Sequence, residues 1–127
     1  MELVAIVTVL VLIQYVVLSV RVGQARTRYG VEAPAISGHP MFERHFRIHQ
    51  NTLEQLIVFL PALWLFAIYA SSRLAALLGL VFIAARFVYE RGYLDDPKRR
   101  ETGAIMTAVT TGILLLGGLI GAIVRAL

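Results

Sequence analysis

The 127-residue chain contains no cysteine, so it has no disulfide, no cysteine-ligated metal and no thiolate nucleophile of its own. If thiol chemistry takes place here, the thiol comes from a ligand. Histidine is also scarce, and none of His39, His45 and His49 has a second ligating side chain at the spacing of a zinc motif. We therefore expect no metal site.

Charge is rare as well. Charged residues make up 16% of the chain, whereas 58% of the residues are hydrophobic and the mean hydropathy is +0.75. A typical soluble domain has about 45–50% apolar and about 25% charged residues. Residues 3–20, 55–72 and 102–124 carry no charge, and residues 74–89 carry only Arg86. Because roughly 20 helical residues cross a bilayer core about 30 Å thick, the sequence predicts an all-α integral membrane protein.

The uncharged runs and the turn residues beside them predict one domain over residues 1–127, built as a four-transmembrane-helix bundle. The helices are expected at about residues 3–29, 41–70, 74–93 and 97–124. For the last of these, Asp96 is the expected N-cap and Pro97 the first helical residue.

The basic residues gather in two of the three connections between these helices. Nine cations lie in the first and third connections or beside them: Arg21, Arg26, Arg28, Arg44, Arg47, Arg91, Lys98, Arg99 and Arg100. The opposite side has only Arg73 and Arg125. The positive-inside rule therefore predicts that the first and third connections are cytoplasmic and that both termini lie on the opposite side. The net charge of +4 then reflects topology, and we expect no nucleic-acid partner.

A cluster of ionisable and amide side chains lies at the start of the second helix, in FERHFRIHQNTLEQLIVFLPALW, residues 42–64. At about 100° per residue, Arg47, Asn51 and Glu54 fall on one helix face. Ionisable groups inside a membrane are costly and usually mark functional sites. This face suits a small zwitterionic ligand, because arginine holds carboxylates in forked hydrogen bonds and Glu54 can hold an ammonium group.

A second polar face is predicted on the third helix and consists of Arg86, Tyr89, Glu90 and Tyr93. Arg86 and Glu90 have the i,i+4 spacing of a helical ion pair, and we expect them to pair. An ion pair between Arg47 and Glu54 is the structural alternative to a ligand site on the second helix.

By these residues the chain resembles the MAPEG family, the membrane-associated proteins of eicosanoid and glutathione metabolism. Residues 42–64 resemble its second-helix signature, FER-x-x-R-x-x-x-N-x-x-E followed by an apolar run with proline and tryptophan. ARFVYERGY, residues 85–93, resembles its third-helix motif, and RVGQARTRYGVEAPAISGHP, residues 21–40, resembles its first connection. The resemblance is nearest to the microsomal glutathione transferase and leukotriene-C synthase branch.

The resemblance implies a homotrimer that binds glutathione between neighbouring subunits near the cytoplasmic side. The residues it implies for binding are Arg26 from a neighbouring subunit, Arg47, His49, Asn51, Glu54, Tyr89 and Tyr93. Among these, Arg47, Asn51 and Glu54 would hold the glutamyl end. Arg100 matches the arginine that stabilises the thiolate of glutathione.

The chain departs from the family pattern at two positions: Gln55 stands where the leukotriene-C synthase has a tyrosine, and Thr27 replaces a second arginine. The sequence also leaves open whether Arg99 or Arg100 activates the thiol. Both lie in the first turn of the fourth helix, where the macrodipole disfavours cations. Topology, an anionic lipid or an anionic ligand is therefore needed to favour them.

The implied chemistry follows from the thiol of glutathione, whose ordinary pKa is about 8.5. A nearby guanidinium favours the thiolate, which attacks a hydrophobic electrophile or reduces a lipid hydroperoxide supplied by the membrane lipids. The expected activity is a detoxifying glutathione S-transferase with peroxidase activity, and the sequence identifies neither the second substrate nor the reaction type. A non-catalytic lipid-binding scaffold is the alternative. A small proton-coupled exporter is less favoured, because the first helix has only Gln14 in its middle.

Overall fold

The computed structural model describes all 127 residues and consists of four long helices. They are α1 (Glu2–Tyr29), α2 (Pro40–Tyr69), α3 (Ser72–Asp95) and α4 (Glu101–Ala126), with a short 3₁₀ turn, η1 (Pro97–Arg100), before α4. All four helices are long and apolar enough to cross a membrane. The prediction of an all-α bundle with four membrane-spanning helices is therefore confirmed.

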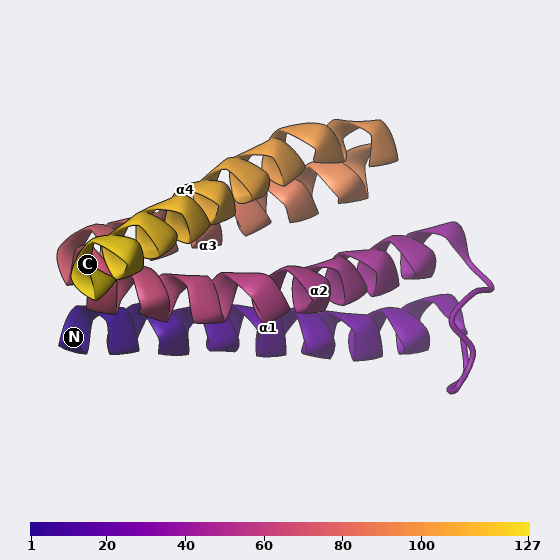
Figure 1. Ribbon diagram of the computed structural model, residues 1–127. Helices are drawn as coiled ribbons and strands as arrows, with labels where there is room; N and C mark the ends of the chain where they lie inside the picture. Colours follow the sequence, from indigo (N-terminus) through magenta and orange to yellow (C-terminus); the bar gives the residue numbers. More distant parts are fainter.

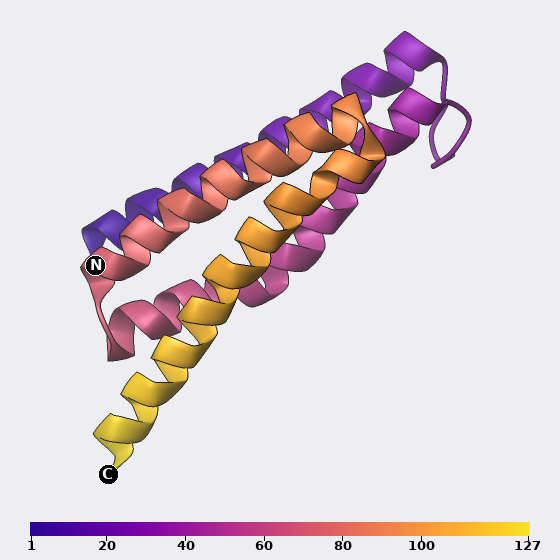
Figure 2. The ribbon, with the colours of Figure 1, turned by 90° about the horizontal axis from the view of Figure 1, so that it is seen from above.

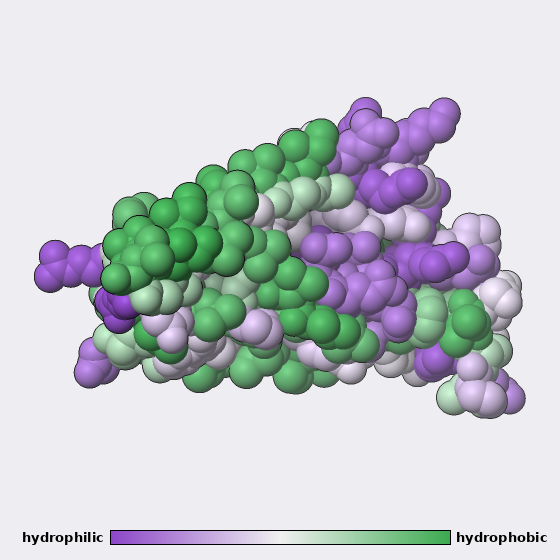
Figure 3. Space-filling model, in the orientation of Figure 1, coloured by the Kyte–Doolittle hydropathy of each residue, from purple (hydrophilic) through white to green (hydrophobic).

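The helices run up and down beside one another, and each connection reverses the direction of the chain. Both termini lie at one end of the bundle, and the α1–α2 and α3–α4 connections lie at the other (Figures 1 and 2). Hydrophobic side chains cover most of the visible face, whereas hydrophilic side chains gather at the end with the two connections and extend over the first half of α2 (Figure 3). The basic residues of both connections thus share one end of the molecule.

Local sequence explains where the helices begin and end. Gly30 ends α1 in the left-handed conformation, with φ of 68°. The Nδ1 atom of His39 accepts a hydrogen bond from the backbone N–H of Met41 at the start of α2. The hydroxyl of Ser71 accepts from the N–H of Leu74 and caps α3.

The helix predicted to start at Pro97 starts differently. Asp96 does act as the cap, since its carboxylate accepts from the N–H of Lys98. The N–H of Arg99, however, donates to the carbonyl of Asp96, which is the tighter spacing of a 3₁₀ turn. The α-helical part therefore begins only at Glu101.

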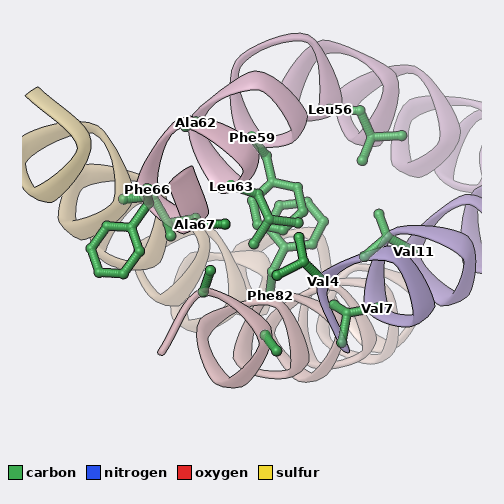
Figure 4. Close-up of a cluster of buried hydrophobic side chains, with 13 residues drawn as sticks. Val4, Val7, Val11, Leu56, Phe59, Ala62, Leu63, Phe66, Ala67 and Phe82 are labelled. Atoms are coloured by element: carbon green, nitrogen blue, oxygen red, sulfur yellow. The ribbon is translucent and has the colours of Figure 1, made fainter. Parts of the chain in front are cut away.

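The main core is formed by 13 buried residues, twelve of them from α1, α2 and α3 and one, Leu114, from α4. At its centre the rings of Phe59 and Phe82 stack with their centroids 3.7 Å apart (Figure 4). Val4, Val7 and Val11 of α1 close the cluster from the other side. These apolar contacts join the helices, while many other apolar side chains point outward, as expected for a protein surrounded by lipid.

Two glycines bring the end of α3 against the start of α4. A Cβ at Gly103 would overlap the backbone of Tyr89, and one at Gly92 would overlap the carbonyl oxygen of Arg99. These close approaches place η1 directly beside the last turns of α3. Farther along α4, Gly117 and Gly121 face Phe66 and Tyr69 of α2, so their GxxxG spacing serves packing inside the subunit.

Candidate functional site

A polar hollow of about 300 Å³ lies where α2, the end of α3 and η1 meet. Seven residues line it: Arg47, Gln50, Asn51, Glu54, Tyr89, Tyr93 and Arg100. Six of these are among the eight site residues predicted from the sequence. Residues up to 53 positions apart in the chain, from Arg47 to Arg100, thus share one small cavity.

The α2 side of the hollow follows from helical spacing. Arg47, Asn51 and Glu54 are four and three positions apart and therefore face the same way. Ile48 and Thr52, on the neighbouring face, are buried against the rest of the bundle. Helix α2 thus presents a guanidinium, an amide and a carboxylate along one line.

Arg47 and Glu54 do not pair with each other, so the structural alternative of an ion pair between them is wrong. Both line the hollow, and no salt bridge joins them. The reason is geometric, because seven positions along an α-helix correspond to about 10 Å. A positive and a negative group are therefore held at separate points of the same cavity.

The opposite wall is aromatic and cationic. The rings of Tyr89 and Tyr93 meet edge to face with centroids 5.7 Å apart. The guanidinium carbon of Arg100 lies 5.6 Å from the centre of the Tyr93 ring, and its Nη1 donates to the carbonyl of Pro97 at 2.6 Å. This wall carries two phenol groups and one fixed cation.

Arg99 takes a different direction from Arg100. Its Nη1 donates to the Asp95 carboxylate at 2.5 Å, and its side chain is 70% exposed. Arg99 lines a separate depression on the other side of α3. Of the two candidate arginines, the structure therefore brings Arg100 alone into the polar hollow.

Arg86 is buried behind the hollow, with 2% of its surface exposed. Its Nη2 donates to Asn51 Oδ1 at 2.7 Å and to Thr52 Oγ1 at 2.9 Å. Its Nη1 donates to Thr107 Oγ1 of α4 at 3.3 Å. The guanidinium also lies 4.1 Å from the centre of the Tyr89 ring. One side chain of α3 thus binds α2 and α4 and holds two walls of the hollow.

The expected ion pair between Arg86 and Glu90 is therefore wrong. Glu90 instead forms a salt bridge with Arg21 of α1. Arg86 points toward the oxygen atoms of α2 and α4, while Glu90 points toward α1. The i,i+4 spacing permitted the pair, but the neighbouring helices offered each group a different partner.

Two predicted residues lie outside the hollow of their own chain. Arg26 donates to the carbonyl of Ala35 at 2.6 Å and lies over the ring of Phe42. His49 stacks on Tyr15 of α1, with ring centroids 4.7 Å apart. Neither is brought to the other six residues within one subunit.

Sequence reasoning did not assign Gln50 and Arg86 to the site. Gln50 lines the hollow next to Asn51, and the sequence showed it only as one more polar group. For Arg86 the sequence did indicate a role inside the bundle, because a lone cation within an apolar helix needs polar partners there. Its partners come from helices far away in the chain, so the sequence did not identify them.

Comparison with known proteins gives consistent matches along the chain. The model of the MAPEG family matches residues 4–120. An uncharacterized protein of Synechocystis, sll1147, is 44% identical over 116 residues, which cover 91% of this chain and 85% of that protein. Microsomal glutathione S-transferase 2 of Homo sapiens is 40% identical over 121 residues, covering 95% and 80%. Leukotriene C4 synthase of Mus musculus is 34% identical over 125 residues, covering 98% and 83%.

The role of Arg86 gives a first prediction. Arg86→Lys keeps the charge but loses the planar fork, so one ammonium group cannot replace the bonds to Asn51, Thr52 and Thr107 together. We expect a loss of about 1–3 kcal/mol of stability, the cost of leaving buried polar groups without partners. Thermal unfolding in detergent measures this, with the exposed Arg73→Lys as the control. Equal unfolding temperatures for the two variants would show that Arg86 does not hold the helices together.

Proposed function

Because the chain belongs to the MAPEG family, we propose that it is a glutathione-dependent membrane enzyme. It activates the glutathione thiol for transfer to hydrophobic electrophiles, or for reduction of lipid hydroperoxides. The observation that carries the proposal is the convergence of six predicted side chains in one polar hollow. Two of the relatives, a glutathione S-transferase and a leukotriene C4 synthase, support it by their names.

The α2 face of the hollow matches the glutamyl end of glutathione. This end carries an α-carboxylate and an α-ammonium group, and Arg47 and Glu54 offer the complementary charges at separate points. The Arg47 guanidinium holds the carboxylate in a forked hydrogen bond, and Glu54 holds the ammonium group. Asn51 lies between them, and its side-chain oxygen is already occupied by Arg86, so its amide N–H groups remain for the ligand.

The other wall activates the thiol. Arg100 supplies a fixed guanidinium beside Tyr93, and a cation near a thiol favours the ionised form. The resulting thiolate attacks an electrophilic carbon of an apolar substrate. As the new carbon–sulfur bond forms, the bond from that carbon to a leaving group breaks, or an epoxide C–O or activated C=C bond opens, and the released anion takes up a proton. Because the chain has no cysteine, glutathione is the source of the reacting sulfur. The bilayer concentrates the apolar substrate next to the site.

The complete site is formed between subunits of a homotrimer. Arg26 and His49 lie outside the hollow of their own chain, as a site shared between subunits requires. In the assembly, Arg26 of one subunit completes the hollow of its neighbour. His49 reaches the same ligand from the boundary between the two chains.

The end of the bundle with the α1–α2 and α3–α4 connections is cytoplasmic in this proposal. Nine cations lie at that end and two at the other, and the structure brings the two basic connections together (Figure 1). Glutathione then reaches the hollow from the cytoplasm.

The orientation is tested with single cysteines in this naturally cysteine-free chain. A cysteine at exposed Ser37, in the α1–α2 connection, is expected to be protected from a membrane-impermeant thiol reagent in intact cells. One at exposed Ala70, in the α2–α3 connection, is expected to react. Permeabilised cells serve as the control, because both positions should then react. If only Ser37→Cys is labelled in intact cells, the α1–α2 connection lies outside the cell and the proposed orientation is wrong.

The binding role of Arg47 gives a third prediction. Arg47→Ala should weaken glutathione binding by about 1.5–3 kcal/mol, the range for a hydrogen bond to a charged group. Isothermal titration calorimetry measures the affinity, and Arg73→Ala, at the opposite end of the bundle, is the matched control. Unchanged affinity in Arg47→Ala would remove this residue from the ligand site.

The activating role of Arg100 gives a fourth prediction, with its neighbour as an internal control. If the Arg100 guanidinium stabilises the thiolate, Arg100→Ala raises the pKa of bound glutathione. Turnover then falls at neutral pH and partly recovers as the pH rises, because base supplies the anion. Arg99→Ala should leave the titration unchanged, since Arg99 faces a different depression.

Ultraviolet absorbance of the bound thiolate, titrated against pH, distinguishes the two arginines directly. A shifted curve in Arg100→Ala alone supports the assignment. A shift in Arg99→Ala instead would move the activating role to that residue. Glutathione affinity measured on the same samples should change little, because the glutamyl contacts on α2 remain.

A further inference from the structure

A second surface runs along the face of α3 that points away from the polar hollow. Tyr89 and Tyr93 line the hollow, whereas Phe87 and Arg91 are each two positions from Tyr89, about 160° around the helix. In the trimer proposed above, a neighbouring subunit covers the hollow, and this face of α3 is then left toward the lipid.

The part of this surface in the membrane is an apolar groove between α1 and α3, with a volume of about 330 Å³. Leu10, Val17, Leu80 and Phe87 line it, and each is between 40 and 50% exposed. The groove is also lined by Arg86 and, toward the basic depression, by Arg21 and Glu90, whose salt bridge adds no net charge. The groove thus offers an extended apolar channel that opens to the bilayer.

The part beyond the groove is a basic depression of about 570 Å³ that begins at the same residue, Phe87. Arg91 and Arg99 supply its two positive charges, and Asp95, which pairs with Arg99, supplies its one negative charge. The exposed side chain of Thr102 lines it as well. The depression therefore carries a net positive charge at the point where the apolar surface ends.

The groove and the depression together have the dimensions of one leaflet. From Leu80 to Arg91 the surface follows α3 over 11 residues, which is about 16 Å along the helix axis. Half of the hydrocarbon core of a bilayer is about 15 Å. An acyl chain lying in the groove would thus bring its headgroup to Arg91 and Arg99.

We propose that this face of α3 binds an anionic phospholipid of the membrane. One acyl chain lies in the α1–α3 groove, and the phosphate lies between Arg91 and Arg99. Guanidinium groups bind phosphate oxygens through paired hydrogen bonds, and Asp95 fixes the direction of Arg99. A lipid with no net charge gains less from the excess positive charge of the depression.

This occupant also accounts for a cation that the polar hollow does not use. Arg99 lies at the N-terminal end of α4, where the helix macrodipole opposes a positive side chain. The same macrodipole favours an anion, so a phosphate beside Arg99 is stabilised by both the side chain and the helix end. The proposal does not depend on glutathione or on the reaction at the hollow.

The test compares phosphatidylglycerol with phosphatidylcholine of identical acyl chains by native mass spectrometry of the detergent-purified protein. We expect phosphatidylglycerol to bind more tightly to the wild type. Arg91→Gln with Arg99→Gln should reduce that preference by roughly 25-fold, at about five-fold for each arginine near a membrane surface. Arg73→Gln with Arg125→Gln, which removes two cations from the opposite end, should leave it unchanged.

Two further measurements distinguish a lipid site from a site for a free anion. Inorganic phosphate in excess should not displace the lipid, because it lacks the chain that fills the groove, and displacement would show a free-anion site instead. Val17→Trp fills the groove without changing Arg91 or Arg99. It should therefore weaken the binding of both lipids. Equal binding of the two lipids to the wild type overturns the proposal, whatever the variants do.

Discussion

The architecture of the site depends on one buried guanidinium. Arg86 interrupts an apolar helix, and a cation there is costly unless the surrounding protein supplies oxygen atoms. Those oxygens come from Asn51 and Thr52 of α2 and Thr107 of α4, so solvating the cation fixes three helices relative to one another. The same contacts turn the Asn51 amide toward the hollow, and the guanidinium lies against the ring of Tyr89. The packing of the helices and the shape of the hollow are therefore set by the same group of hydrogen bonds.

Helix α3 separates two surfaces of different chemistry. Its Tyr89 face contributes to the polar hollow, and its Phe87 face passes from the apolar groove to the basic depression. The short turn η1 extends this separation to two adjacent arginines. In a 3₁₀ turn successive residues are about 120° apart, so Arg99 and Arg100 point to opposite sides of α3. Gly92 and Gly103 permit the close approach that places this turn against the helix.

The fold was largely predictable because uncharged runs long enough to cross a bilayer are a local property of the sequence. The α2 side of the site was predictable for a similar reason, since Arg47, Asn51 and Glu54 share a face in any α-helix. The partners of Arg86 and Glu90 were not predictable, because helical spacing allowed them to pair and only the packing of α1, α2 and α4 decided otherwise. The sequence left the choice between Arg99 and Arg100 open for a related reason. It depends on a 3₁₀ turn that looks like the start of an α-helix in the sequence.

The separation of charges in the hollow limits what can occupy it. Arg47 and Glu54 are held about two helical turns apart and do not neutralise each other. Both side chains are exposed in the single subunit, so a ligand with one charge would gain a partner from only one of them and leave the other in water. A ligand with both charges gains a charged hydrogen bond at each point, and this complementarity is the basis on which we propose a zwitterionic ligand. In the proposed complex, Arg100 on the opposite wall would act on a third group of the same ligand. In a chain without cysteine, a thiol carried by that ligand is the group whose ionisation a cation at this position would favour.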